Sequence, residues 1–293
     1  MRRVLVTGAG GFIGRHALEP LAARGFEVIT PGRAEVDLLA PDGPACAVAL
    51  AQPTHLLHLA WYAEHGRFWR APENLRWIDA TLRLLEAFAA AGGQRAVCAG
   101  TCAEYAWDGD GDLEESTSPL RPATLYGAAK HAAHTAGAAL CEQEGIALAW
   151  GRVFFLYGPG EHPRRLVASV ARNLLAGLEA PTSHGRQERD FLHVADAGEA
   201  LAALVDAEVT GAVNVASGEP ATVRGVVEEV ARAAQAEDLL RVGALPVRED
   251  DPPRLVTRAA RLRDETGWRP RWRLDDGVAD AVAWWRAQGV RPR

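Results

Sequence analysis

Short apolar runs alternate with longer alanine-rich stretches along the first half of the chain. The apolar runs have the length of buried strands and cover residues 4–6, 27–29, 55–59, 95–99 and 147–153. The stretches between and after them have helical length and cover residues 12–24, 43–51, 73–91, 123–144 and 164–177. Strands joined by helix-length connections predict an α/β fold with a doubly wound parallel sheet and right-handed crossovers.

The pattern changes after about residue 160. Shorter strands are predicted at 189–194, 212–216 and 241–247, with helices at 195–206, 222–235 and 275–288. Prolines and charges cluster at 249–254 and predict an exposed loop. We therefore expect a sheet domain over residues 1–160 and a smaller region over 161–293, some of whose segments return to the sheet. The smaller region is expected to close over the carboxyl edge of the strands, where open α/β sheets bind ligands.

Composition narrows the function classes. The chain has 293 residues, 48% hydrophobic and 24% charged, as in soluble globular proteins. Its net charge of −6 disfavours a nucleic-acid partner, which binds a basic face. No apolar run approaches the roughly 20 residues of a membrane span and no signal peptide precedes the first strand, so we expect a cytoplasmic protein without membrane contact. The cysteines lack metal-ligand spacing, so we expect reduced thiols and no metal site, and His58 and His193 are expected to be core histidines.

Three glycines follow the first apolar run at the spacing G-x-x-G-x-x-G. They are Gly8, Gly11 and Gly14, and a predicted helix begins beside them. Glycines at these points allow a tight turn and a close approach of the backbone to a pyrophosphate, which the helix N-terminus also attracts. The turn therefore predicts a Rossmann-type dinucleotide-binding domain over residues 1–160. From the glycines alone, a turn without a ligand is the alternative.

The end of the second predicted strand bears on which dinucleotide binds. No acid stands there to accept a ribose 2′-hydroxyl, and Arg33 could pair with a 2′-phosphate instead. We therefore favour NADP and leave NAD open. Asp37 and Leu38 follow and could bind the adenine. The alternatives are a solvated loop arginine and an ordinary aspartate at a helix start.

Tyr126 and Lys130 are four residues apart on a predicted helix, which places them on one face. A nearby ammonium favours the tyrosinate, so Lys130 is expected to lower the pKa of Tyr126 toward the working pH of an acid or base. Thr101 ends the fourth predicted strand, and the connecting segment is long enough to bring Tyr126 beside it. The plain alternative is a tyrosine at a helix start near an exposed lysine.

Further motifs follow one another along almost the whole chain. They are Thr7–Gly14, His58–Ala60, Thr101–Tyr105, Tyr126–Lys130, Arg152–Gly160, Arg189–Asp196, Asn214–Gly218 and Leu262–Trp268. Together they resemble the extended short-chain dehydrogenase/reductase family, in particular its nucleotide-sugar epimerases, dehydratases and ketoreductases. The resemblance is specific, because the motifs agree in type and in order.

The resemblance implies roles for individual residues. Tyr126 would give or take the proton at the reacting sugar oxygen, Thr101 would hydrogen-bond the same oxygen, and Lys130 would hold the nicotinamide ribose. Arg189 would contact the nucleotide diphosphate, with a salt bridge to Asp196 as the alternative, and Asp196 is expected to start or cap a helix. The expected cofactor residues are Gly8, Gly11, Phe12, Ile13, Gly14, Arg33, Asp37, Leu38, Leu59, Ala60, Tyr126, Lys130 and Val153. The expected substrate residues are Thr101, Cys102, Phe155, Arg165, Leu166, Arg189 and Arg254.

Departures from the family limit the reaction. Sugar 4,6-dehydratases carry an acid–base pair after the catalytic threonine, and Cys102 and Ala103 replace it here, so dehydration is not expected. Phe155 replaces an asparagine of many relatives, so substrate contacts there must differ. The segment 61–69 is unusually aromatic. Its rings could stack on a ligand ring, or they could pack a lid or a subunit contact.

We therefore predict an enzyme that reduces a nucleotide-activated 4-keto-6-deoxy sugar at C4 with NADP(H), with Tyr126 as proton donor. A nucleotide-sugar 4-epimerase with bound NAD is the first alternative. A non-catalytic NAD(P)-binding regulatory protein is the second, and the intact Tyr126 and Lys130 argue against it. The partner is then a nucleotide-diphosphate sugar, and a homodimer is expected. The nucleotide base and the sugar stereochemistry do not follow from the sequence.

Overall fold

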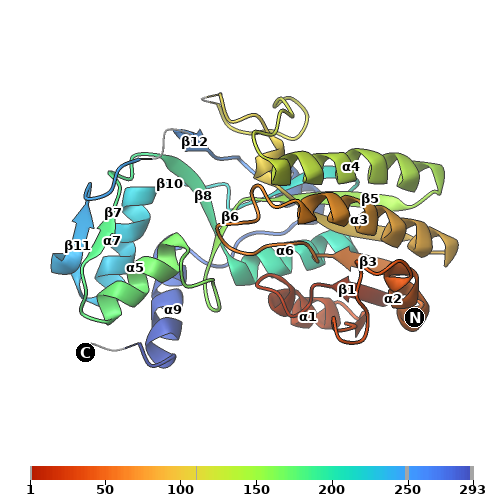
Figure 1. The fold of residues 1–293 in the computed structure, drawn as a ribbon, viewed down its shortest axis with the longest axis horizontal. Coiled ribbons are helices and arrows are strands. Elements are labelled where there is room, and N and C mark those ends of the chain that lie inside the picture. Colours follow the sequence, from red (N-terminus) through yellow and green to blue (C-terminus); the bar gives the residue numbers. More distant parts are fainter. Residues whose placement is uncertain (1, 110, 248–250, 291–293) are drawn as a thin grey trace.

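Six parallel strands form the central sheet of the structure, a computed structural model that describes residues 2–109, 111–247 and 251–290 (Figure 1). Their order is β2-β1-β3-β4-β5-β9, and every neighbouring pair is parallel. The chain changes direction across the sheet between β1 and β3, where such folds bind ligands. The predicted doubly wound parallel sheet is confirmed. The strands are β1 (Arg3–Thr7), β2 (Glu27–Ile29), β3 (His55–His58), β4 (Arg95–Thr101), β5 (Ala147–Val153) and β9 (Gly211–Val215).

Helices cover both faces of this sheet, and the central strands are apolar for that reason. On β1, Val4 and Val6 pack in the cluster formed with α1 and α6, whereas Leu5 packs in the cluster formed with α2 and α3. Figure 1 shows α3 and α4 on one side of the sheet and α1 and α6 on the other. These helices are α1 (Gly14–Ala23), α2 (Gly43–Ala51), α3 (Glu73–Ala90), α4 (Leu125–Gln143) and α6 (Val194–Asp206).

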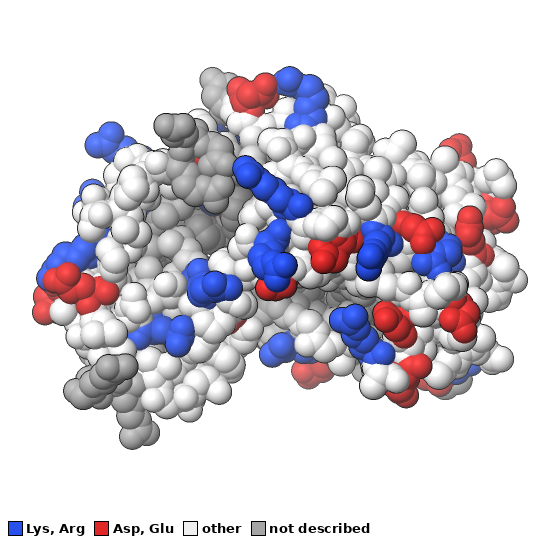
Figure 2. Space-filling model, in the orientation of Figure 1, with Lys and Arg blue, Asp and Glu red and all other residues white. Residues whose placement is uncertain are grey.

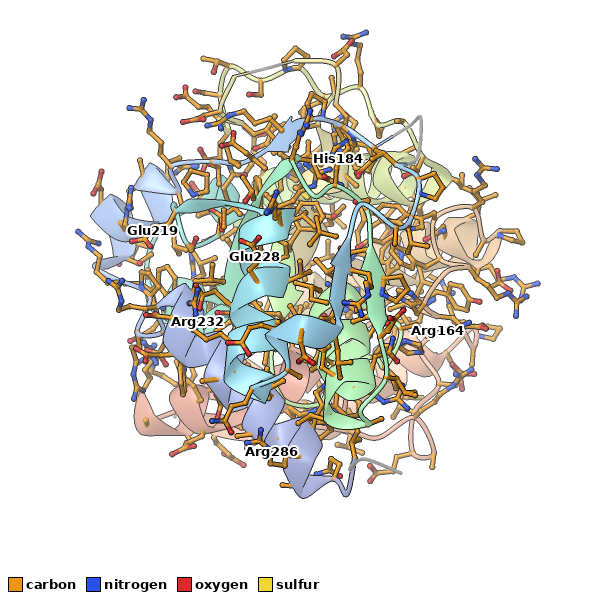
Figure 3. The ribbon with its side chains drawn as sticks, turned by 90° about the vertical axis from the view of Figure 1, so that its left-hand side faces the viewer. Arg164, His184, Glu219, Glu228, Arg232 and Arg286 are labelled. Carbon is orange, nitrogen blue, oxygen red and sulfur yellow. The ribbon has the colours of Figure 1, made fainter. Side chains whose placement is uncertain are left out.

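A smaller part, at the left of Figure 1, is built from short strands and three helices that pack on one another. On α7, Val226 and Val230 are buried in this packing, while Glu228 and Arg232 lie on the outer side (Figure 3). β8 pairs with β6, β10 and β12, and β7 pairs with β11. The strands are β6 (Phe155–Tyr157), β7 (Ala180–Thr182), β8 (Glu188–His193), β10 (Pro220–Thr222), β11 (Leu240–Val242) and β12 (Arg254–Leu255). The helices of this part are α5 (Leu166–Leu175), α7 (Val223–Ala234) and α9 (Leu274–Ala287), with the shorter η2 (Glu237–Leu239). Outside it, η1 (Cys102–Glu104) packs on α4, and α8 (Ala260–Thr266) contacts β9 and α6.

The differences from the predicted elements fall in this smaller part. β6, β7, β10 and β12 were not predicted, because two or three residues carry no visible alternation. The strand expected at 241–247 ends early, since Gly243 turns the chain with φ +84°. The exposed loop expected at 249–254 is confirmed in part: residues 251–253 lie in a loop and Pro253 is exposed, but Pro252 is buried and Arg254 lies in β12. The first two residues of that range lie outside the described part of the chain.

The C-terminal half also contributes to the central sheet, since β9 is its sixth strand. We keep the division at residue 160 as a proposal for where the substrate-binding region begins. Within the described residues, no helix is both long enough and apolar enough to cross a bilayer.

Candidate active site

The glycine-rich turn joins β1 to α1 and lies directly against the segment that follows β3. Gly8 has φ +73°, and a Cβ on it would lie 2.7 Å from the backbone nitrogen of Ala60. Gly11 donates a 2.9 Å hydrogen bond to the carbonyl of Gly8, and a Cβ on Gly14 would collide with that same carbonyl. Backbone atoms therefore occupy the positions that side chains would take at Gly8 and Gly14. The turn carries no side chains at these glycines, which allows the close approach of a pyrophosphate.

His58 joins the ends of β1 and β3 at the point where the strand order changes direction. Its Nδ1 lies 2.7 Å from Oγ1 of Thr7, and its Nε2 lies 3.0 Å from Oγ1 of Thr81. Burial lowers the pKa of His58 to about 3, so the ring is neutral. The prediction of a core histidine is confirmed. Leu59 and Ala60, expected at the cofactor, both hydrogen-bond Thr7 through their backbone nitrogens.

An acid that the sequence analysis missed lies near the end of β2. Oε2 of Glu35 accepts a 2.8 Å hydrogen bond from the backbone nitrogen of Gly32, and Arg33 between them is exposed. The spacing of three residues, typical of a side chain that closes a turn, was the signal available. Asp37 closes the next turn through the backbone nitrogen of Leu39. A guanidinium and a carboxylate therefore both flank the place where the ribose is expected.

Thr101 is the last residue of β4 and the N-cap of η1. Its Oγ1 accepts a 3.2 Å hydrogen bond from the nitrogen of Ala103, and its own nitrogen donates to Glu104 at 2.9 Å. Tyr126 is the second residue of α4, and the side chain of Thr101 lies near enough to its hydroxyl to lower its pKa. The two predicted catalytic hydroxyls are thus neighbours. A Cβ on Gly127 would collide with the carbonyl of Ala103, so glycine is what lets α4 come this close to η1.

The electrostatics of Tyr126 differ from the prediction. Burial raises its pKa, and the first group that opposes the rise is the Thr101 hydroxyl rather than Lys130. The expectation that Lys130 lowers the pKa of Tyr126 is therefore wrong for this structure. Lys130 is itself buried, which lowers its pKa to about 7. Its Nζ donates a 2.6 Å hydrogen bond to the carbonyl of Ala99.

The aromatic segment 61–69 lies against both predicted catalytic side chains. The rings of Phe68 and Trp69 meet Tyr126 nearly edge-on, with centroid distances of 5.0 and 5.7 Å. The nitrogen of Tyr126 donates a 3.1 Å hydrogen bond to the carbonyl of Trp69. The ring of Trp61 lies 3.9 Å from Nζ of Lys130. The segment is therefore part of the site.

The residues after Thr101 offer no acid or base to a substrate. Cys102 is buried, which raises the pKa of its thiol to about 12, and Ala103 has no polar side chain. The next carboxylate, Glu104, is fully buried and faces inward. Its oxygens accept 2.9 Å hydrogen bonds from Nε1 of Trp150 and Nε of Arg152.

Three possible metal-ligand atoms, from Glu104, His131 and His134, lie within 4.8 Å of one another. The guanidinium of Arg152 already neutralises Glu104 at 2.9 Å, so a cation there would face a fixed positive charge. The cluster is better explained as part of the buried network around Glu104.

Arg189 is 4% exposed and is tied to the loop before β12. It donates to Asp251 at 2.6 Å and to the carbonyl of Pro252 at 2.7 Å. The alternative of a salt bridge to Asp196 is wrong. Asp196 instead accepts hydrogen bonds from two backbone nitrogens at positions 271 and 272. The expected cap of α6 is supplied by His193, whose Nδ1 accepts from Ala195 at 3.3 Å.

The other predicted substrate residues surround this region. Arg165 caps α5 and donates to Glu161 and to the carbonyl of Leu156, both at 2.9 Å, and Leu166 follows it. Arg165 acts to lower the pKa of Tyr126, as Arg189 does for Cys102, so both guanidinium groups lie near the site. Arg254 is 2.6 Å from Asp112 and also pairs with Glu188. Phe155 is the first residue of β6, and its ring centroid lies 5.4 Å from the guanidinium carbon of Arg189. Val153 is the last residue of β5 and pairs in register with Thr101.

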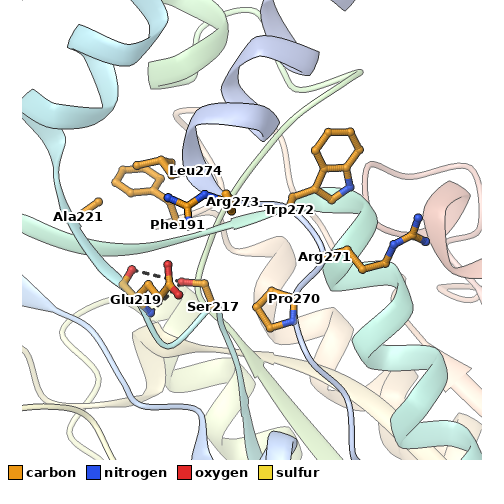
Figure 4. Close-up of a pocket in the computed structure, with 9 residues that line it drawn as sticks. All are labelled: Phe191, Ser217, Glu219, Ala221, Pro270, Arg271, Trp272, Arg273 and Leu274. Carbon is orange, nitrogen blue, oxygen red and sulfur yellow. Dashed lines mark hydrogen bonds between the residues drawn. The ribbon is translucent and has the colours of Figure 1, made fainter.

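Figures 2 and 4 show the charged side chains on one face and a separate cavity. Lys130, the one lysine of the chain, is buried, so the blue side chains in Figure 2 are arginines, several of them around the middle of that face. Figure 4 shows a separate cavity of about 80 Å³ between β8 and the segment before α9. No predicted catalytic residue lines it. Its lining is Phe191, Ser217, Glu219, Ala221, Pro270, Arg271, Trp272, Arg273 and Leu274.

Known proteins are similar to this chain in sequence and in fold. Residues 4–216 match the model of the NAD dependent epimerase/dehydratase family. The GDP-6-deoxy-D-mannose reductase of Pseudomonas aeruginosa is 30% identical over 310 positions, which cover 98% of each chain. The crystal structure of the UDP-glucose 4-epimerase of Thermus thermophilus in complex with NAD is 32% identical, with a TM-score of 0.85 over 97% of this chain and 99% of that one. The structure of RMD from Pseudomonas aeruginosa complexed with NADPH is 26% identical, with a TM-score of 0.81 over 98% of this chain and 100% of that one.

These matches extend over nearly the full length of the chain and include both the glycine-rich turn and the residues around Thr101 and Tyr126. The resemblance read from the ordered motifs is confirmed. The chain belongs to the NAD dependent epimerase/dehydratase family.

Proposed function

We propose that the protein reduces a nucleotide-activated 4-keto-6-deoxy sugar at C4 with NADPH, and that Tyr126 donates the proton. The proposal rests on the proximity of the Thr101 and Tyr126 hydroxyls, at a site where Cys102 and Ala103 provide no acid or base for dehydration. A carbonyl oxygen lying against the two hydroxyls could accept a hydrogen bond from each. A bound nicotinamide would supply the hydride to the carbonyl carbon.

The protonation state of Tyr126 supports reduction over oxidation. Burial raises its pKa, so the phenol keeps its proton near neutral pH. As the carbonyl oxygen gains negative charge, that proton moves from the phenol to the oxygen, and the Thr101 hydroxyl stabilises the tyrosinate left behind. An epimerase begins by oxidising an alcohol, for which the tyrosine must first have lost its proton.

The substrate is expected to bring its diphosphate to the arginines beside the site. Arg165 and Arg189 lie near Tyr126 and Cys102, respectively, as their effects on those pKa values indicate. A guanidinium can pair with phosphate oxygens through two parallel hydrogen bonds. The related GDP-6-deoxy-D-mannose reductase, 30% identical, supports a nucleotide sugar as the substrate class.

An epimerase with bound NAD is the second candidate. The observation that favours it is Glu35, whose carboxylate lies at the turn after β2 and would repel a 2′-phosphate while accepting a bond from a ribose hydroxyl. The 32% identical neighbour, a UDP-glucose 4-epimerase in complex with NAD, supports the same candidate. Arg33 in the same turn argues for NADP.

Mixing the purified protein with NADPH or NADH and a panel of nucleotide 4-keto sugars tests these candidates. Stoichiometric oxidation of the reduced nicotinamide with sugar reduction would support the reductase. Interconversion of two nucleotide sugars without net oxidation would support the epimerase and contradict the reductase. The matched control is the Tyr126→Phe variant, which should bind cofactor and do neither reaction.

We further propose a homodimer. Leu75 on α3 is 56% exposed, the largest value among the exposed large hydrophobic side chains of the described residues. Two-fold symmetric dimers are the commonest oligomers of soluble proteins, and an interface at α3 would cover this side chain. Sedimentation of the wild type and of Leu75→Glu would test it: a wild type that sediments as a monomer contradicts the proposal.

A further inference from the structure

Lys130 differs in chemical type from the other strongly basic residues of this chain. It is the one lysine among 32 lysine and arginine residues, and it is 3% exposed. Every other lysine or arginine position holds an arginine, which stays charged in nearly any environment, whereas a buried lysine titrates readily. The state of this one amine therefore depends on the groups that surround it.

Few groups stabilise the charge on Lys130. Its Nζ donates one hydrogen bond, to the carbonyl of Ala99 at 2.6 Å. Among the described residues no carboxylate lies within ion-pair distance of it. The remaining close partner is Trp61, whose ring centroid is 3.9 Å from Nζ. A cation at this distance over an indole face is attracted by the ring quadrupole, and most strongly where water is excluded.

The Trp61 ring is itself held in place. Its Nε1 donates a 2.8 Å hydrogen bond to Oδ1 of Asn74, and its face stacks on Trp77 with centroids 6.1 Å apart. Asn74 is fully buried and also donates to the carbonyls of Phe68 and Ala71, at 2.7 and 2.9 Å. One asparagine thus links the aromatic segment 61–69 to the position of the Trp61 ring.

We propose that Trp61 is a positioning residue for Lys130: its indole face holds the ammonium charged and in place within the site. The use of that ammonium in cofactor binding and turnover rests on the proposed function. The contact between Trp61 and Lys130 is present in the free protein and does not rest on the proposed function. The aromatic segment then acts on the reaction through Lys130, in addition to packing against Tyr126.

The other titratable groups around Lys130 act in both directions. Burial lowers its pKa to about 7, and Glu104 and Cys98 oppose this fall. His58 faces it as a neutral ring, since its own pKa is about 3, and Tyr126 lies one helical turn away with a raised pKa. Because burial disfavours the charged amine, a contact that favours the charge bears directly on the protonation of Lys130.

The single lysine makes a direct test possible. Protein grown with carbon-13 lysine labelled at Cε gives one side-chain signal, and its titration reports the pKa of Lys130 in the free protein. Because the ring favours the charged form, Trp61→Leu should lower this pKa by about one unit. Trp61→Phe keeps a weaker ring and should lower it less. Trp284→Phe, which changes a ring on α9 in the smaller part, is the control and should leave it unchanged.

A second measurement distinguishes two effects of the Trp61 ring on the pKa of Lys130. One is the attraction between the ring and the charge, and the other is the exclusion of water by a bulky side chain. Growth with fluorinated tryptophan withdraws electron density from the ring at nearly constant volume. It should lower the pKa of Lys130 in the wild type and have no effect in Trp61→Phe. An unchanged or raised pKa in Trp61→Leu, or an equal response to fluorination in both proteins, would overturn the proposal.

The experiments distinguish a failure of the proposed function from a failure of the proposed role of Trp61. A wild type that turns over no nucleotide sugar would remove the proposed reaction, while the lysine titration would still decide the role of Trp61. Where the reaction is present, Trp61→Leu should bind NADPH more weakly at neutral pH and regain affinity as the pH is lowered and Lys130 becomes charged. Equal NADPH affinity for the wild type and Trp61→Leu across that range would contradict the link from Trp61 through Lys130 to the cofactor.

Discussion

The carboxylate of Glu104 and the guanidinium of Arg152 form a fully buried ion pair at 2.9 Å, and the same carboxylate accepts a hydrogen bond from the nitrogen of Thr101. Arg152 continues the network to the hydroxyl of Tyr105, which donates to Asn214. The network ties β4, β5 and β9 together beside Thr101, one of the two hydroxyl residues that we propose as catalytic. Glu104 thus holds the backbone of Thr101 from inside the protein.

Glu104→Gln should therefore cost both stability and turnover. It leaves Arg152 buried without its counter-charge, which typically costs about 3–5 kcal/mol. The free energy of unfolding by urea measures the loss. Glu228→Gln is the matched control, because its pair with Arg224 is exposed and should be worth under about 1 kcal/mol. Equal losses for the two variants would contradict the structural role of the buried pair.

Tyr126→Phe should remove most turnover while folding and cofactor binding persist. The phenol carries the proton, and general acid catalysis of this kind contributes about 10²–10⁴-fold. Steady-state kinetics with calorimetric titration of NADPH measures both effects. The control is Thr135→Val, which removes an exposed hydroxyl on the same helix, bonded to the carbonyl of His131. A Tyr126→Phe variant with wild-type kcat would show that the proton comes from elsewhere.

Substitutions at Arg33 and Glu35 should change cofactor preference in opposite directions. Arg33→Ala should weaken NADPH by roughly ten- to a hundredfold and NADH much less, because it removes one charge-assisted phosphate contact. Glu35→Gln removes a negative charge and keeps the acceptor for the Gly32 nitrogen, so it should favour NADPH. Titration of both nucleotides measures the ratio. Equal losses for NADPH and NADH in Arg33→Ala would exclude a role at the 2′-phosphate.

Arg189→Ala should raise the KM for a nucleotide sugar by about one to two powers of ten, with little change in NADPH affinity. It should also lower the melting temperature, because Arg189 holds Asp251 and Pro252. Asp251→Asn separates the two effects: it weakens the internal pair but keeps the guanidinium, so the melting temperature should fall without a rise in KM. An unchanged KM in Arg189→Ala would remove Arg189 from the substrate site.

Acid should destabilise the protein through its buried histidines. The pKa of His58 falls from 6.5 when exposed to about 3 when folded, so between these values the unfolded chain binds a proton that the folded one does not. Stability from this group is complete above about pH 6.5 and is lost as the pH falls toward 3, by up to about 1.4 kcal/mol per pH unit.

The test compares unfolding free energies of the wild type and His58→Gln at several pH values. The variant lacks this titration, so its stability should fall less steeply below pH 6.5. Taking the difference between the two proteins cancels the buried carboxyls Glu161 and Asp190, whose raised pKa values act in the opposite direction. Parallel curves would mean that His58 is not held neutral by burial.

The sequence by itself determined the fold class and indicated which residues to propose as catalytic. Alternating strand and helix lengths identified the parallel sheet, and Gly8, Gly11 and Gly14 identified the turn that the structure shows. Thr101, Tyr126 and Lys130 could be named because each lies at a defined place in a local element: a strand end and one face of a helix. Periodicity and spacing are local properties, and a single sequence carries them.

Only the tertiary structure decided the partners and the charge states. Arg189 meets Asp251, Lys130 meets Trp61, and Glu104 meets Arg152, and nothing in their spacing along the chain foretells these pairs. The two-residue strand β12 forms because it pairs with β8 in the tertiary structure. The pKa of Tyr126 rises rather than falls because burial is produced by segments distant in sequence. Desolvation depends on everything that packs around a group, so it emerges only when the whole chain has folded.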